Sequence, residues 1–514
     1  MSAESSSAAS VIESVADPGT FRAWTVQQHV PSDEAYAASL DRARQRSGAA
    51  EAVLVGELLL AGQRLAVIAG EFGFLAGSVG ASAAETIVAA LDRATAERLP
   101  VLAMPTSGGT RMQEGTPAFL QMVPIAAAVA RHRRAGLAYL VWLRDPTTGG
   151  VMATWGSLGQ VCVGAPGALA GFLGPRVYEA VFSRGFPTGV QVTENLVRVG
   201  VIDAVVPQEE LREWVRRVLA VVATPGESDP AAGSGAGGPE TTGSTEDLEL
   251  TIPDAWDCVL ATRDPGRPGV RQFLAAAATD VTELSGTGEG ERDPGILLAL
   301  ARLGGRSCVV VGQDRSAAGT FGPGGLRTAR RGYRLAAELG LPLLTVVDTE
   351  GAELSAAAEE GAMAGEIARN LAELSLLPVP VVALLLGSGC GGGALALLPS
   401  DVLIAASDAW ITPLPPEGAS AIVHRTTAEA PRMAREQRIT AVELASLGVV
   451  DALVPPLTAV GEADFLDACA DAVARGLSLP GPAPTPDRID RFSRAVGPSV
   501  VPGSPQVEGA GDDR

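Results

Sequence analysis

Short apolar runs that end in turns of small residues recur along this chain and set its predicted architecture. Runs of strand length begin at Leu99, Tyr139 and Val381, and each is followed by a turn rich in Gly, Ser or Thr. Such continuous runs are typical of strands buried on both faces of a parallel sheet. Helix-competent stretches, among them Ala83–Arg98 and Arg327–Leu339, lie between the strands. The alternation predicts βαβ units of an α/β fold, with the glycine turns at the carboxyl ends of the strands.

The pattern occurs twice in the same order. Three segments of the first half match three of the second at offsets of 242 to 248 residues: LPVLAMPTSGGTRM from Leu99 with LPLLTVVDTEGAEL from Leu341, YLVWLRDPTTGGVMAT from Tyr139 with VVALLLGSGCGGGALAL from Val381, and VGVIDAVVP from Val199 with LGVVDALVP from Leu447. Three ordered matches at nearly constant offset indicate a tandem duplication.

A segment rich in Gly, Pro, Ser, Thr and acidic residues, 224–246, separates the two copies. Its composition is typical of a flexible linker, and the end of the chain is similar. We therefore predict one domain over residues 1–223, the linker at 224–246, a second domain over 247–496 and a disordered tail at 497–514.

Composition narrows the class of function. The net charge of −20 argues against a nucleic-acid partner, because a phosphate backbone requires a basic face. The apolar runs are too short to cross a membrane, and the N-terminal residues lack the layout of a signal peptide, so a cytoplasmic location is expected. Lysine is absent, which excludes Schiff-base chemistry and a P-loop lysine. The five Cys and three His are dispersed, and no metal site is predicted.

The glycine turns carry the candidate chemistry. Gly149 and Gly150 lie between an apolar strand, Leu140–Leu143, and the segment Val151–Leu158, which is competent to form a helix. A strand–glycine–helix junction presents unpaired backbone N–H groups, which can hold an oxyanion such as a thioester enolate. One such pair alone more often reflects tight packing, but a glycine turn at the matching position of the second half favours a functional role.

These and neighbouring stretches resemble a known family. The first half resembles the β-type carboxyltransferase subunit of acetyl-CoA carboxylase and its acyl-CoA carboxylase relatives, through FGFLAGSVGASAAE from Phe72, SGGTRMQEG from Ser107, DPTTGGVMAT from Asp145 and PGALAGFLGPRVYE from Pro166. The second half resembles the α-type subunit, through GPGGLRTARRGYRLA from Gly322, DTEGAELSAAAEEGAMAGEIARNL from Asp348, GSGCGGGALAL from Gly387 and PLPPEGASAIVHR from Pro413. The order is that of a fused carboxyltransferase.

The resemblance implies two crotonase-like domains of the ββα superhelical type. It further implies transfer of a carboxyl group from carboxybiotin to acetyl-CoA, or a short acyl-CoA, giving malonyl-CoA for fatty acid biosynthesis. The backbone N–H groups of Gly149 and Gly150 are then expected to face the acyl-CoA enolate. Those of Gly392 and Gly393 are expected to face the ureido oxygen of biotin. No side chain is needed as a base in this scheme, since the biotin that remains takes the α-proton.

The resemblance also places the turn of Gly108, Gly109 and Arg111 beside the CoA pocket, as substrate-binding residues. Contacts to the CoA phosphates require arginine in a chain without lysine, and the candidates are Arg64, Arg111 and Arg176. Taken from the residues alone, an internal salt bridge between Arg111 and Glu114 is the favoured role for that arginine.

Partners follow from what the chain lacks. Without lysine it cannot be biotinylated, and it has no nucleotide-binding glycine motif, so a biotin carboxyl carrier protein and a biotin carboxylase must be separate. In the resembled family the site forms between a β-type unit of one protomer and an α-type unit of another. We therefore expect a homodimer or a higher oligomer, because a single chain does not easily bring its own halves together in that way. The four-Cys zinc ribbon of bacterial β-type subunits is missing, so no zinc is expected.

Two other functions remain open at this point. A crotonase-type acyl-CoA decarboxylase or hydratase would need the enolate site without carboxybiotin, and a non-catalytic assembly subunit would need neither. The second half departs from the α-type pattern at several positions, among them Glu350 and Cys390. A nucleophilic role for Cys390 or a general-base role for His424 is less favoured than a structural one, since neither has an evident partner in the sequence.

Overall fold

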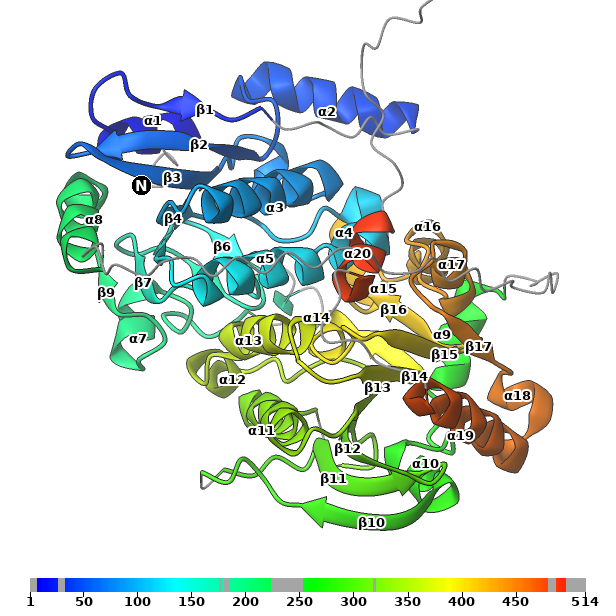
Figure 1. Ribbon diagram of the computed structural model, residues 1–514. Helices are drawn as coiled ribbons and strands as arrows, with labels where there is room; N and C mark the ends of the chain where they lie inside the picture. The colour runs from blue at the N-terminus through cyan, green and yellow to red at the C-terminus, as the bar shows by residue number, and fades with distance from the viewer. Residues whose placement is uncertain are drawn as a thin grey trace, which may run out of the picture.

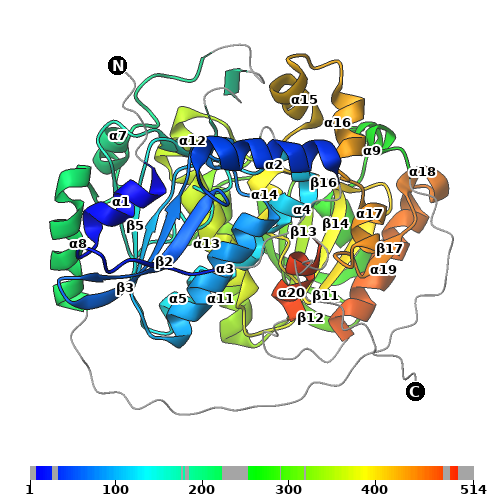
Figure 2. The same cartoon turned by 90° about the horizontal axis from the view of Figure 1, so that it is seen from above.

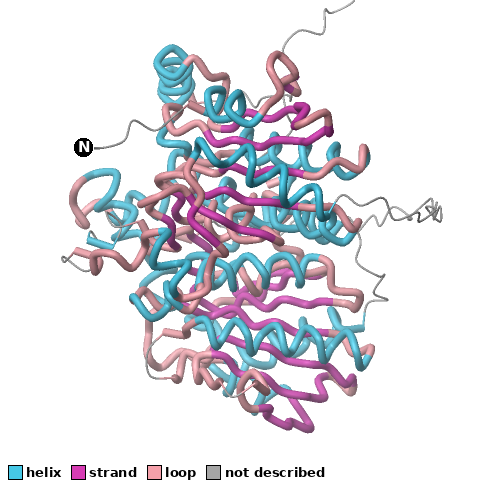
Figure 3. Tube along the Cα trace, turned by 90° about the vertical axis from the view of Figure 1, so that its left-hand side faces the viewer, coloured by secondary structure: helices cyan, strands magenta, loops and turns pink. Residues whose placement is uncertain are grey.

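The computed structural model describes residues 7–25, 33–174, 178–179, 185–222, 253–289, 291–317, 320–478 and 487–495. Arg176, the predicted linker and the predicted tail lie outside these ranges. The described part of the chain forms two mixed sheets. Figure 3 shows them as two sets of strands, one above the other, with helices between them.

The first sheet has the order β1-β2-β3-β4-β5-β7-β9 (Figure 1). The strands from β3 onward are parallel, while β1, β2 and β3 are antiparallel. The strands are β1 (Arg22–Ala23), β2 (Val53–Leu60), β3 (Gln63–Gly70), β4 (Val101–Met104), β5 (Tyr139–Leu143), β7 (Val161–Gly164) and β9 (Ala204–Val205), with β6 (Thr147–Thr148) and β8 (Ala170–Gly171) as a separate pair. The helices are α1 (Ala8–Val15), α2 (Glu34–Ser47), α3 (Ala81–Ala96), α4 (Gly115–Leu120), α5 (Met122–Arg134), α7 (Thr193–Arg198) and α8 (Gln208–Val222).

The second sheet repeats this plan with the order β10-β11-β12-β13-β14-β15-β17, and β16 pairs with the end of β14. Its strands are β10 (Ala278–Leu284), β11 (Ile296–Leu303), β12 (Arg306–Gln313), β13 (Leu343–Thr349), β14 (Val381–Cys390), β15 (Val402–Ala406), β16 (Trp410–Thr412) and β17 (Ala452–Val454). Its helices are α9 (Ala255–Thr262), α10 (Val270–Ala277), α11 (Pro323–Leu339), α12 (Ala356–Glu360), α13 (Met363–Ser375), α14 (Gly391–Leu395), α15 (Pro416–His424), α16 (Ala430–Glu436), α17 (Ala441–Ser446), α18 (Leu457–Val460), α19 (Glu462–Ser478) and α20 (Asp487–Arg494).

The central strands are buried because their residues are apolar on both faces. Every residue of β4, β5 and β14 is buried, as the continuous hydrophobic runs predicted. Helices α5 and α13 lie side by side where the two halves meet (Figure 1). One hydrophobic cluster contains core side chains of both halves, so the halves pack as one body.

Corresponding turns of the two halves have the same conformation. The Gly109 N–H donates to Ser107 Oγ at 3.0 Å, and Gly109 has a φ of +117°. The Gly351 N–H donates to Thr349 Oγ1 at 3.1 Å, and Gly351 has a φ of +132°. Both positions require the conformational freedom of glycine. The offset is 242 residues at each position, which matches the repeat found in the sequence.

The segment Val151–Leu158 does not form the helix that its composition allows. It makes a series of turns in which the Ala153 N–H donates to the Gly149 carbonyl and the Gly156 N–H to the Val151 carbonyl. The Thr154 hydroxyl donates to the Gly150 carbonyl at 2.6 Å. A hydroxyl bonded back to the main chain and an internal glycine both weaken a helix, and the ladder is irregular here.

Helix α20 joins the two halves after both sheets are complete (Figure 1, Figure 2). The Gln121 side chain of the first half donates to the Phe492 carbonyl at 2.7 Å. Arg488 is fully buried and donates to the carbonyls of Leu374, Leu377 and Val379. Its guanidinium also binds the carboxylate of Asp401. The C-terminal helix therefore fastens the second sheet to helices of the first half.

Candidate active site

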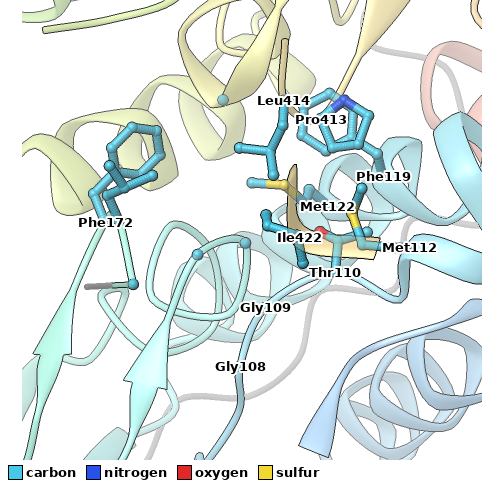
Figure 4. A pocket seen from close by; sticks show the side chains of 15 residues that line it. Gly108, Gly109, Thr110, Met112, Phe119, Met122, Phe172, Pro413, Leu414 and Ile422 are labelled. Atoms are coloured by element: carbon cyan, nitrogen blue, oxygen red, sulfur yellow. The ribbon is translucent and has the colours of Figure 1, made fainter. Parts of the chain in front are cut away.

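A cavity of about 150 Å³ lies between the halves at the carboxyl ends of their strands. It is lined by Gly108, Gly109, Thr110, Met112, Phe119, Met122, Gly149, Gly150, Phe172, Leu173 and Gly174 of the first half and by Gly392, Pro413, Leu414 and Ile422 of the second. In Figure 4, Phe172 lies on one side and Met122, Phe119 and Leu414 gather on the other. The fold therefore brings five predicted glycines into one cavity, which we call the glycine cavity.

Gly149 and Gly150 have different roles in this structure. Gly149 has a φ of +64°, and its N–H donates to the Phe172 carbonyl at 3.1 Å. The Gly150 N–H has no acceptor among the described residues, and the same holds for the Thr110 N–H in the neighbouring turn. The expectation that both glycines offer free N–H groups is corrected: Gly149 shapes the turn, and Gly150 presents the donor. Thr110 was not singled out in the sequence.

The second glycine turn is shifted by one residue from the expected pair. Gly391 has a φ of +70°, which makes it the counterpart of Gly149, so Gly392 corresponds to Gly150. Gly392 faces the glycine cavity, where a Cβ on it would lie 3.2 Å from Phe172 Cε2. A Cβ on Gly393 would lie 2.6 Å from Phe321 Cζ. Gly393 is therefore fixed by packing and does not line the cavity, contrary to the expectation from the motif.

The first-half loop that contains Phe172 is bound by a carboxylate of the second half. Glu359 of α12 accepts the N–H groups of Phe172 at 2.9 Å and Leu173 at 3.0 Å, and the Gln191 side-chain amide at 2.7 Å. Burial raises the pKa of Glu359, and the three donors oppose that shift. This carboxylate positions the loop whose carbonyl holds Gly149. Nothing in the sequence connects residues 187 positions apart, so the contact was not predicted.

Arg111 is a positioning residue in this geometry. Its side chain is 1% exposed and forms an ion pair with Glu51, with a longer contact of 3.5 Å to Glu114. Burial opposes the charge of Arg111, but the Glu51 carboxylate outweighs it and raises the pKa. The buried guanidinium stabilises the turn through these internal contacts. The resemblance had implied that it contacts the substrate. Arg64, another candidate for the CoA phosphates, forms ion pairs with Glu57 and Glu97 at the surface.

The glycine cavity offers backbone donors and an apolar wall. Among the described residues, those that line it include no acidic, basic or cysteine side chain. Cys390 lies behind the turn, 2% exposed, and burial raises the pKa of its thiol, so it is a poor nucleophile. His424 does not line the cavity either. Such a site can stabilise an anion and exclude water.

The described ranges hold neither a cluster of metal ligands nor a membrane-spanning helix. There, no three His, Cys, Asp or Glu side chains gather closely enough to hold a metal ion. Within the same ranges, no helix combines the length and the apolar character needed to cross a membrane.

Residues 11–473 match the carboxyl transferase domain family. The chain therefore belongs to the carboxyl transferase family, which confirms the resemblance and the two crotonase-like domains it implies. A probable biotin-dependent acyl-coenzyme A carboxylase beta3 subunit of Mycobacterium tuberculosis is 51% identical over 490 residues, covering 93% of this chain and 96% of that protein. The acetyl-coenzyme A carboxylase carboxyl transferase subunits beta/alpha of Salinispora tropica are 40% identical over 430 residues, covering 82% and 76%. Among solved structures, transcarboxylase 12S shares 20% identity and a TM-score of 0.38, covering 92% of this chain and 90% of that one.

Proposed function

We propose that this chain is the carboxyltransferase component of a biotin-dependent acyl-CoA carboxylase. The observation that carries the proposal is the single apolar cavity into which both halves bring a glycine turn, Gly150 from one side and Gly392 from the other. Two reactants that each develop charge on an oxygen need two separate donors. The names of the two relatives described above support the same activity.

The residues of the chain account for the chemistry as follows. The Gly150 N–H donates to the thioester oxygen as the α-carbon of the acyl-CoA loses its proton. The Gly392 N–H would hold the ureido oxygen of a carboxybiotin group, which when bound would supply the carboxyl group and accept the α-proton. The apolar side chains, among them Met122, Phe172 and Leu414, keep water away from the carbanion. No side chain of the cavity is needed to transfer a proton.

We propose a short acyl-CoA as the substrate, with acetyl-CoA giving malonyl-CoA as the first choice and propionyl-CoA as its rival. Biotin would arrive on a carrier protein that is loaded by a separate biotin carboxylase. We also propose a homodimer or a higher oligomer. One chain brings Gly150 and Gly392 to the same cavity, so pairing of two chains is not needed to form it.

The test uses the purified full-length chain in the reverse direction. With malonyl-CoA and biocytin, the proposal expects transfer of the carboxyl group to biocytin and release of acetyl-CoA. Acetyl-CoA released at the same rate without biocytin would instead identify a crotonase-type decarboxylase. Binding of malonyl-CoA with no turnover under either condition would identify an assembly subunit.

A further inference from the structure

A second cavity lies at the seam of the halves, apart from the glycine cavity. It has a volume of about 370 Å³ and is lined by Ala130, Arg133, Arg134, Leu158 and Gln160 of the first half and by Arg330, Arg369, Ala372 and Glu373 of the second. Four guanidinium groups thus line it against one carboxylate. Arg133 is eleven residues along α5 from Met122, or about 16 Å at 1.5 Å per residue. We call this second site the arginine cavity.

Two of these arginines are paired with carboxylates, and two are not. Arg330 binds Glu373 and Glu366, and Arg369 also binds Glu366. In the described ranges, no carboxylate lies within salt-bridge distance of Arg133 or Arg134. Arg134 donates to the Leu376 carbonyl at 3.1 Å.

Arg133 lacks a partner although it is half-buried. Its Nε is buried with no hydrogen-bond partner among the described atoms. Burial and the nearby charge of Arg369 lower its pKa. An unpaired buried donor on a charged group carries a substantial desolvation cost, which an anion in the cavity would offset.

The duplication shows which group is missing. Gln160 and Asp401 occupy equivalent places: the Gln160 side-chain oxygen accepts the Tyr139 N–H at 2.6 Å, and the Asp401 carboxylate accepts the Val381 N–H at 2.8 Å. In the second half, Asp401 also neutralises the buried Arg488. In the first half, the corresponding place holds a neutral amide beside unpaired arginines. Arg133 and Arg134 are specific to the first half, because Ser375 and Leu376 stand 242 residues further on, and the place of the carboxylate that serves Arg488 holds an amide here.

We propose that the arginine cavity binds a phosphate group of a small molecule. Guanidinium groups hold phosphate through paired, charge-assisted hydrogen bonds, and Arg133 and Arg134 have donors to spare. A dianion balances the excess of positive charge along the lining. The phosphate is either that of the CoA nucleotide or that of a free phosphorylated metabolite. The proposal does not depend on the carboxyl transfer proposed above.

The first experiment titrates the full-length chain with pyrophosphate by calorimetry, at an ionic strength held constant with NaCl. We expect saturable binding of one pyrophosphate. Arg133→Gln should weaken it by roughly tenfold or more, since one charge-assisted partner is lost. The control is Arg131→Gln, which removes the same charge from the same helix but from an exposed pair with Asp92. Absence of saturable binding, or equal weakening in both variants, would overturn the proposal.

A second variant protects the test against misfolding of Arg133→Gln. Gln160→Glu places a carboxylate in the arginine cavity, at the position that Asp401 occupies in the second half. Because this carboxylate would pair with the arginines itself, the variant should no longer bind pyrophosphate. Unchanged binding in this variant would also count against the arginine cavity.

Competition between CoA and pyrophosphate distinguishes the two possible sources of the phosphate group. If CoA displaces pyrophosphate and Arg133→Gln raises the KM for acyl-CoA, the cavity holds the nucleotide of the substrate. If pyrophosphate binds equally well to the CoA-saturated chain, the cavity holds a separate phosphorylated metabolite. Both outcomes require the cavity to bind phosphate.

Discussion

A methyl group placed on Gly150 probes the proposed oxyanion donor directly. In Gly150→Ala the added Cβ would lie 3.0 Å from Thr110 Oγ1 and 3.1 Å from Met122 Sδ. A shift of a few tenths of an ångström relieves both contacts, so we expect a folding cost of about 1 kcal/mol. The methyl group also occupies the space beside the free N–H, and the thioester oxygen can no longer reach it. Loss of one such donor lowers kcat by roughly 10² to 10³.

The assay compares kcat for transfer from malonyl-CoA to biocytin with the melting temperature of each variant. The matched control is Gly149→Ala. Its φ of +64° strains an alanine by about 1–2 kcal/mol, while its N–H can remain bonded to the Phe172 carbonyl. We expect Gly149→Ala to lose more stability than Gly150→Ala and less kcat. A larger loss of kcat in Gly149→Ala, at an equal melting temperature, would refute the assignment of the donor to Gly150.

Three further predictions concern side chains around the site and the seam. Met122 separates the glycine cavity from a small apolar space bounded by Trp155. Met122→Ala joins the two spaces, so the ratio of kcat/KM for hexanoyl-CoA to that for acetyl-CoA should rise at least tenfold. An unchanged ratio would contradict this prediction. Glu51→Gln leaves Arg111 buried with its main carboxylate gone, so urea denaturation should show a loss of about 3–5 kcal/mol, and a loss below 1 kcal/mol argues against a buried pair. Burial opposes ionisation of Glu366, but three arginines outweigh it and lower the pKa of Glu366 below its ordinary 4.5. The stability that Glu366 provides is therefore present above pH 4.5 and is lost as the pH falls through the lowered pKa. Melting curves of Glu366→Gln should differ from the unsubstituted chain at pH 7 and converge with it in acid, whereas a constant difference would exclude the linkage.

The sequence predicted most reliably the elements whose hydrophobic pattern is continuous. The run from Val381 became the fully buried β14, and the stretch Arg327–Leu339 lies within α11. The antiparallel pair β2–β3 was not predicted, because its residues are mostly apolar and lack a strict alternation. The segment Val151–Leu158 was predicted wrongly because its composition allows a helix, while side-chain bonds to the main chain decide otherwise.

The candidate site was predicted in its parts but not in its register. Three consecutive glycines from Gly391 to Gly393 do not reveal which one takes a positive φ. That choice depends on where β14 ends its pairing with β16, at Cys390 and Thr412, and hence on the tertiary fold. Contacts such as that between Glu359 and Phe172 depend on how the two halves pack, which no local pattern encodes.

The place of α20 in the chain sets an order for assembly during synthesis. Its Arg488 binds the carboxylate of Asp401 together with three carbonyls in the last turn of α13 and just beyond it, and its main chain accepts a bond from Gln121. On the ribosome, where segments fold in the order in which they emerge, both sheets are available before this helix appears. Until then the Asp401 carboxylate lacks its partner Arg488, and Gln121 of the first half lacks its acceptor at Phe492. We therefore expect the nascent chain to pass through a stage with two formed sheets and a junction that still lacks the contacts of α20.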